Sequence, residues 1–121
     1  MQKTSASIRY AKALFYLALE NNISKEVLDD LKIMLRTLKA EKSLSLLITN
    51  PTISQSVKKT VFDRIFNQKV NKITMNFILL VIKKGREMYF SDMIYKYEKI
   101  YNEHKNIRVV EVISSEPLTD S

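Results

Sequence analysis

The chain has 121 residues, which fits one domain built around a single hydrophobic core. Hydrophobic residues make up 45% of the chain, charged residues make up 27%, and the formal net charge is +7. This much apolar material can offset the entropic cost of ordering, so the composition argues against an intrinsically disordered chain. The absence of Cys excludes disulfides, thiolate nucleophiles and zinc–thiolate sites, and it favours an intracellular location.

One Gly and two Pro leave few of the tight turns that sheets and barrels need, so the composition predicts helices. The apolar run at residues 11–19 contains Lys12 and is not followed by a small-residue cleavage signature, so we expect no signal peptide. Residues 73–82 are largely apolar but are followed at once by Lys83 and Lys84. We therefore expect no transmembrane span.

Three helices are predicted in the first half of the chain. The first covers about residues 5–21, and Ser24 is the predicted N-cap of the second. The second ends near Ala40 and carries an amphipathic stripe made of Val27, Leu28, Leu31, Met34, Leu35 and Leu38. A short third helix at residues 43–48 stops before Pro51, because Pro cannot extend a helix and excludes helical geometry at the residue before it.

Three more helices follow the Pro51 turn. The fourth begins near Ser54, with an expected apolar side of Val57, Val61, Phe62, Ile65 and Phe66 and an expected polar side of Lys58, Lys59, Asp63 and Arg64. The fifth covers about residues 72–84 and closes at Gly85, which suits a left-handed cap. The sixth begins at residues 91–92 and runs to about residue 105, with a stripe of Met93, Ile94, Tyr97, Ile100, Tyr101 and His104.

The pattern changes after Asn106. Residues 107–115, IRVVEVISS, are rich in β-branched side chains and have a period near two, which predicts a strand. A single strand has no partner in a helical chain. The sequence therefore predicts an all-α six-helix bundle at residues 1–106, with five long helices and one short one. Residues 107–121 are predicted to be a strand-like tail, either a linker into a further domain or its first strand.

No constellation of residues points to chemistry. The only His, His104, falls on a helical stripe, where a packed or surface role is the simpler interpretation. The acidic residues are dispersed along the chain, so no metal site is expected. A single Gly cannot build a phosphate-cradling loop, and no cofactor is expected. We predict a binding domain and not an enzyme.

Two helices have more apolar surface than one face of a bundle requires. In the first, polar or charged positions fill a sector of only about 80°, and in the fifth, apolar residues sweep about 200°, with Ile73 and Leu80 outside that arc. Either both helices lie centrally in the bundle, or part of this surface receives an amphipathic helix from a partner. Periodicity alone leaves both explanations open.

Four segments stand out together: RYAKALFYLAL (residues 9–19), LITNPTIS (47–54) with Lys58, NFILLVIKKGR (76–86) and VVEVISSEPLT (109–119). In this order and spacing they resemble the ATP synthase delta subunit family, whose mitochondrial relative is the oligomycin-sensitivity-conferring protein. A departure occurs after the Gly-Arg pair, where Glu87-Met88 stands in place of an expected Leu.

The resemblance implies a non-catalytic stator component that links the catalytic head of an F-type ATP synthase to its peripheral stalk and supports proton-driven ATP synthesis. It implies a groove between the first and fifth helices that accepts the N-terminal helix of an alpha subunit. A C-terminal domain outside this chain would meet the stalk's b subunit. The expected place is a peripheral membrane complex at the cytoplasmic face of a bacterial inner membrane, without direct membrane insertion.

Carried over to this sequence, the resemblance gives eight candidate partner-binding residues: Tyr10, Ala13, Leu14, Leu17, Ile78, Leu79, Val81 and Ile82. On the first helix the spacing i, i+3, i+4 and i+7 places the four candidates on one face, where small Ala13 would allow close approach. On the fifth helix the sequence does not separate partner-facing residues from core residues.

The rival interpretation is a basic helical bundle that binds RNA, similar to antitermination factors of the NusB type. It is motivated by the net charge and by Lys83, Lys84 and Arg86. The scatter of Lys along the whole chain argues against a dedicated polyanion site, so we expect no nucleic-acid partner.

Overall fold

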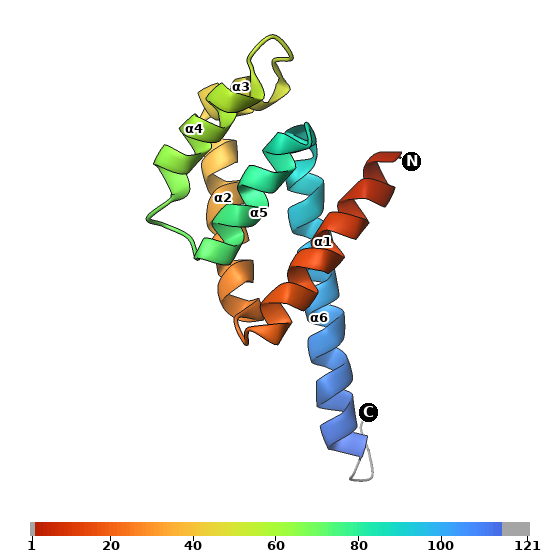
Figure 1. Cartoon of the computed structure of the whole chain (residues 1–121). Helices are drawn as coiled ribbons and strands as arrows, with labels where there is room; N and C mark the ends of the chain where they lie inside the picture. Colours follow the sequence, from red (N-terminus) through yellow and green to blue (C-terminus); the bar gives the residue numbers. More distant parts are fainter. Residues whose placement is uncertain (1, 115–121) are drawn as a thin grey trace.

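The computed structural model describes the backbone of residues 2–114 and the side chains of residues 5–106. The helices are α1 (Gln2–Glu20), α2 (Ser24–Ala40), α3 (Lys42–Thr49), α4 (Gln55–Phe66), α5 (Lys72–Lys83) and α6 (Phe90–Ser114), with a 3-10 turn, η1 (Glu87–Tyr89), before α6 (Figure 1). Within residues 2–114 there is no strand. The predicted all-α six-helix bundle, with one short helix, is confirmed.

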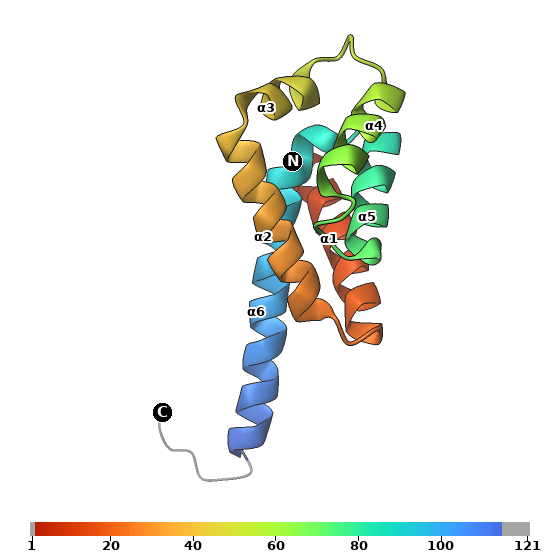
Figure 2. The same ribbon diagram turned by 90° about the vertical axis from the view of Figure 1, so that its left-hand side faces the viewer.

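The long helix α6 has the most extensive contacts with the first two helices of the bundle. It packs along α1 and α2, while α4 and α5 pair with each other, and α3 lies at one end between α2 and α4 (Figures 1 and 2). Large aromatic side chains fill the centre: Phe15 meets Tyr97 edge to face at 5.7 Å between ring centroids, and Phe62 meets Phe90 at the same separation. These rings bury the most apolar area per side chain and therefore dominate the core.

Two helix boundaries follow the predicted chemistry. Ser54 caps α4 by accepting a hydrogen bond from the Val57 backbone N–H at 3.2 Å. Gly85 adopts a φ of 72°, with the Gly85 N–H donating to the Ile82 carbonyl and the Arg86 N–H donating to the Val81 carbonyl. This pair of bonds is the Schellman motif, which satisfies two carbonyls at the C-terminal end of α5.

The predicted cap at Ser24 is wrong. Ile23 occupies the N-cap position of α2 without a side-chain hydrogen bond, and Ser24 is already helical. The chain reverses through Asn22, whose φ is 60°, and the Ile23 N–H returns to the Ala18 carbonyl. Asn tolerates this left-handed geometry, so the turn forms one residue earlier than a serine cap would place it.

The predicted strand after Asn106 is also wrong for the residues that the structure describes. The helix α6 continues to Ser114, so residues 107–114 are helical; the rest of the predicted tail, residues 115–121, lies outside the described residues. Adding residues to an existing helix gains one backbone hydrogen bond per residue, whereas a lone strand gains none. The α6 helix also begins one residue before the predicted start, at Phe90.

Candidate partner-binding face

The first helix lies at the periphery of the bundle. Its inward side buries Ala6, Ser7, Ala11, Leu14, Phe15 and Ala18. On its outward side Ile8, Tyr16 and Leu17 are 37%, 53% and 46% exposed, and Ala13 is exposed between them. The α1 helix is therefore not contacted on most of its sides, and its surplus apolar surface faces outward.

The fifth helix is more deeply placed. Half of its twelve residues are buried: Thr74, Met75, Phe77, Ile78, Val81 and Ile82. Only Leu80, at 43% exposure, is an exposed large apolar side chain of α5, while Leu79 is half-buried. Most of the wide apolar surface of α5 is therefore explained by its central position in the bundle, and not by a partner.

Four of the eight predicted site residues can reach a partner. Tyr10 and Leu79 are half-buried, and Ala13 and Leu17 are exposed. The other four, Leu14, Ile78, Val81 and Ile82, are at most 3% exposed and belong to the core, so the bundle would have to open before they touched a partner. Their core position follows from the period of the helix, which directs them to the side where α2, α4 and α6 already pack.

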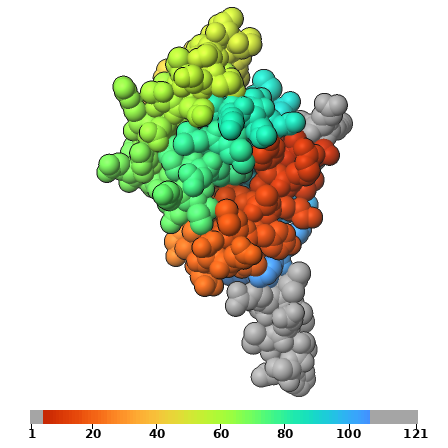
Figure 3. Space-filling view, in the orientation of Figure 1, coloured from red at the N-terminus to blue at the C-terminus, as the bar shows by residue number. Residues whose placement is uncertain are grey.

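Leu80 is exposed but was not among the predicted site residues. Its place outside the apolar arc of α5 could have shown from the sequence that it faces outward. We name the α1–α5 face by its accessible apolar side chains: Tyr10, Ala13 and Leu17 of α1 with Leu79 and Leu80 of α5. Figure 3 shows the two helices side by side across one side of the molecule, α1 in red to orange and α5 in green to teal.

A contact joins the two helices at the end of α5. The guanidinium carbon of Arg86, in the turn after α5, lies 6.0 Å from the ring centroid of Tyr10 on α1. A cation at this distance from an aromatic ring is attracted by its π electrons. Tyr10 is therefore held from one side and presents its remaining exposed surface to the α1–α5 face.

A buried ion pair lies at the same end of α5, and sequence reasoning placed one of its members on the wrong side of α4. Lys58 was expected on the polar side, but it is 2% exposed, and its Nζ lies 2.6 Å from Oε2 of the buried Glu87. The spacing of i, i+4 and i+8 from Lys58 to Phe62 and Phe66 could have shown that Lys58 shares their inward side. Val57, expected on the apolar side, is 49% exposed.

Hydrogen bonds complete the network around this ion pair. Lys58 Nζ also donates to the Ile48 carbonyl at 3.2 Å. Gln55 Nε2 donates to Glu87 Oε1 at 3.2 Å and to the Ile82 carbonyl. We call Gln55, Lys58 and Glu87 the buried network; it ties the end of α3, the start of α4 and the end of α5 to η1. Glu87, the first residue of η1, is therefore the charge partner of Lys58.

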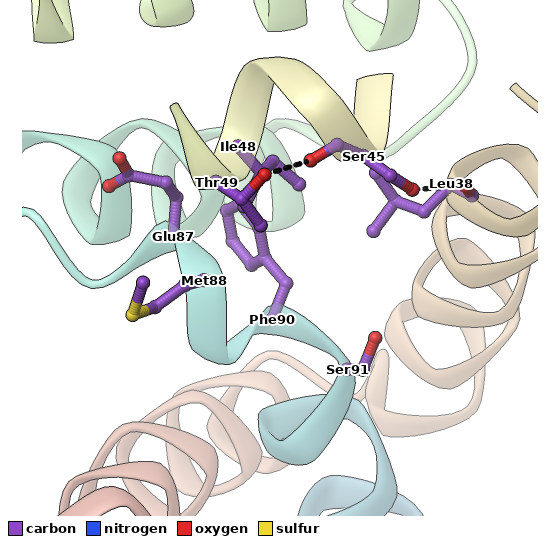
Figure 4. Close-up of a pocket in the computed structure, with 8 residues that line it drawn as sticks. All are labelled: Leu38, Ser45, Ile48, Thr49, Glu87, Met88, Phe90 and Ser91. Atoms are coloured by element: carbon purple, nitrogen blue, oxygen red, sulfur yellow. Dashed lines mark hydrogen bonds between the residues drawn. The ribbon is translucent and has the colours of Figure 1, made fainter. Parts of the chain in front are cut away.

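A pocket of about 140 Å³ opens beside the buried network (Figure 4). Two of its hydroxyls are already engaged: the Ser45 hydroxyl donates to the Leu38 carbonyl at 3.0 Å, and the Thr49 hydroxyl donates to the Ser45 carbonyl at 3.1 Å. A ligand site needs convergent polar groups that remain available. The engaged hydroxyls leave this pocket poorly equipped for one.

Nothing among the described side chains assembles a catalytic or metal site. No group of three or more His, Cys, Asp or Glu residues able to hold a metal ion occurs in residues 5–106. His104 packs edge to face against Phe15 at 5.3 Å, as the simpler interpretation predicted. Burial raises the pKa of Tyr97, whose hydroxyl donates to the Ser24 carbonyl at 2.8 Å.

Of the described helices, none is long and apolar enough to cross a membrane.

Residues 6–121 match the family model described as ATP synthase delta (OSCP) subunit. The chain is 35% identical over 111 residues to "ATP synthase subunit delta, chloroplastic" of Galdieria sulphuraria, covering 92% of this chain and 63% of that protein. It is 37% identical over 110 residues to "ATP synthase subunit delta" of Clostridium botulinum strain Loch Maree, covering 91% of this chain and 62% of that protein. The chain thus spans somewhat less than two thirds of these relatives. Because the family model matches residues 6–121, the chain belongs to the ATP synthase delta (OSCP) subunit family.

Proposed function

We propose that this chain is a non-catalytic part of the stator of an F-type ATP synthase and that it grips the catalytic head. The observation that supports this most directly is the α1–α5 face, where Leu17 and Leu80 stay 46% and 43% exposed on two of the helices that carry the family resemblance. Exposed leucines on adjacent helices gain free energy when another apolar surface covers them. The partner proposed for the face is the N-terminal amphipathic helix of an alpha subunit.

The proposed mechanism is mechanical tethering. A helix laid on the face would bury its apolar stripe against Leu17 and Leu80, while Ala13 lets the two backbones approach closely. A stator holds the head against the torque of rotation, so a few well-buried anchors matter more than total contact area. The chain would contribute binding free energy to ATP synthesis and no chemical step.

The other end of the tether lies in the part of the relatives that this chain does not cover. We propose that residues 1–106 are the head-binding domain and that residues 107–121 lead into a C-terminal domain that binds the b subunit of the peripheral stalk. The complex would be peripheral to an energy-converting membrane. A bacterial membrane is our prediction for it, although the relatives include a chloroplast protein as well as bacterial ones.

The direct test is Ala13→Arg. An arginine there would place a charged side chain in the middle of the α1–α5 face, and we expect binding of the alpha-subunit N-terminal peptide to weaken by several kcal/mol, on the order of 2–4. Calorimetric titration measures the affinity, and circular dichroism checks that the bundle remains folded. The matched control is Ala40→Arg, because Ala40 is also exposed but lies at the end of α2. Equal affinity of both variants and the unsubstituted chain would refute the assignment of the face.

The rival RNA-binding function is separated from this proposal by its response to salt. Binding to a phosphate backbone releases counterions, so its affinity falls log-linearly with salt, with a slope near −0.7 for each phosphate of a single strand. An apolar helix contact responds far less to salt. Titrating the chain with an RNA oligonucleotide and with the alpha-subunit peptide over the same salt series distinguishes the two functions.

A further inference from the structure

Charge is distributed unevenly between the helices of the α1–α5 face and the rest of the bundle. No Asp or Glu occurs in residues 1–19, and none occurs in residues 64–86. Glu20, the last residue of α1, is the only acidic residue in either helix. Cations are present on both helices: Arg9 and Lys12 of α1 and Lys72 and Lys83 of α5 are exposed.

None of these cations forms a salt bridge with an acidic side chain among residues 5–106. The four salt bridges among the described side chains join Lys25 to Asp29, Lys32 to Glu98, Lys58 to Glu87 and Lys96 to Asp92. They lie within α2, between α2 and α6, between α4 and η1, and within α6. Elsewhere the bundle compensates part of its charge internally, whereas α1 and α5 present an excess of positive charge to the outside.

The cations stand next to the leucines and not apart from them. On α5, Lys83 is four residues from Leu79 and three from Leu80, so it lies one helical turn from both. On α1, Arg9 is four residues before Ala13, which is four before Leu17. An apolar strip bordered by positive charge fits a helix with acidic residues beside its apolar stripe.

We propose that the helix received by the α1–α5 face is selected by Asp or Glu residues that border its apolar stripe and pair with Arg9 on one helix and with Lys72 and Lys83 on the other. This inference rests on the proposed function, because it defines the charge pattern of the alpha-subunit segment that binds there. The same cations repel helices bordered by Lys or Arg, so they contribute specificity as well as affinity.

A polyanion is the other ligand that such charges could attract. The leucines on the face favour the helix, because Leu79, Leu80 and Leu17 gain from an apolar stripe and gain little from a phosphate backbone. RNA binding is therefore one of the outcomes that the experiment must separate.

The experiment compares two doubly substituted chains for binding the alpha-subunit N-terminal peptide of the same organism. Lys72→Glu/Lys83→Glu reverses two charges on the face, and the matched control Arg36→Glu/Lys99→Glu makes the same net change at exposed positions of α2 and α6. Glutamate is favourable near the start of α5 and unfavourable near its end, so the effects on the helix dipole oppose each other. Unfolding curves of both variants check their stability.

We expect Lys72→Glu/Lys83→Glu to raise the Kd about tenfold at low salt and much less at high salt, and we expect the control to change it less than about twofold. A peptide whose acidic residues are replaced by Gln should lose affinity for the unsubstituted chain to a similar extent. A peptide whose acidic residues are replaced by Lys should bind the Lys72→Glu/Lys83→Glu variant, because the charges on both sides are then reversed.

Each contrary outcome identifies what fails. If the native peptide does not bind the unsubstituted chain, the proposed function fails and this inference fails with it. Suppose that the native peptide binds the unsubstituted chain and both double variants equally well, and that the Gln peptide binds the unsubstituted chain as tightly as the native peptide does. The charge pattern is then refuted, while the tethering function stands. If a single-stranded RNA oligonucleotide displaces the peptide and loses its affinity in Lys72→Glu/Lys83→Glu, the face is a polyanion site and the inference is overturned.

Discussion

The α1–α5 face and the buried network lie next to each other at the end of α5, but their side chains differ in burial and in pairing. In the network, Lys58 and Glu87 are shielded from water and paired at 2.6 Å, with Gln55 completing the set. On the face, Leu17 and Leu80 stay partly exposed, and the neighbouring Lys83 forms no salt bridge with any of the described side chains. The contrast separates two roles: groups compensated within the chain hold the fold, whereas groups left uncompensated are available to a second molecule.

The largest expected effect comes from breaking the buried network. Lys58→Ala would leave Glu87 buried without its cation, and loss of one member of a buried pair costs about 3–5 kcal/mol. Glu87 would keep the hydrogen bond from Gln55, so we expect a loss at the lower end of this range, about 3 kcal/mol. Urea unfolding measures the free energy. Lys25→Ala, which breaks the exposed pair with Asp29, should leave the free energy of unfolding nearly unchanged. Equal costs for the two variants would show that the network contributes no more than a surface pair.

Two leucines on α1 sharpen the contrast within one helix. Leu14 is 3% exposed, so Leu14→Ala should destabilise the fold by about 2–3 kcal/mol through lost burial and the cavity it leaves. Leu17 is 46% exposed, so Leu17→Ala should change the free energy of unfolding by less than about 0.5 kcal/mol and should instead weaken binding of the alpha-subunit peptide. A fold equally sensitive at both positions would contradict the division of α1 into a core side and a partner side.

A smaller effect is expected at the turn that joins the two regions. Gly85→Ala would put a side chain at a φ of 72°, where an L-residue pays about 1–2 kcal/mol in backbone strain. Space is sufficient, because the nearest atom to the added Cβ would be Gln55 Nε2 at 3.8 Å. We expect a loss of about 1 kcal/mol on thermal or urea unfolding. Gly85→Asn should cost less, because Asn tolerates the left-handed conformation, and the reverse order would contradict this explanation.

The fold could be predicted from the sequence because the ends of several helices are set by residues at or next to those ends. Pro51, Ser54 and Gly85 act through a few neighbouring atoms, and the period of the apolar residues reports helices directly. The strand predicted after Asn106 was wrong because β-branched composition is a weak preference, which a helix already growing through α6 outweighs.

The candidate site could be predicted only in part, since a helical period shows which residues are apolar but not what covers them. Leu14, Ile78, Val81 and Ile82 fit the pattern of a partner-binding surface as well as Leu17 does, yet neighbouring helices bury them. Lys58 shows the same limit for charge, because its partner Glu87 lies 29 residues away and only the tertiary fold brings them together.

The length and placement of α6 have a mechanical consequence. The α1 helix packs across α6, with Phe15 set against both Tyr97 and His104, so buried aromatic side chains join the two helices. A pull along α6 from its C-terminal end, opposed by a grip on α1, would load this contact in shear. Shear stresses many side-chain contacts at once, whereas peeling breaks them one at a time, so the bundle should resist axial force better than its equilibrium stability alone suggests.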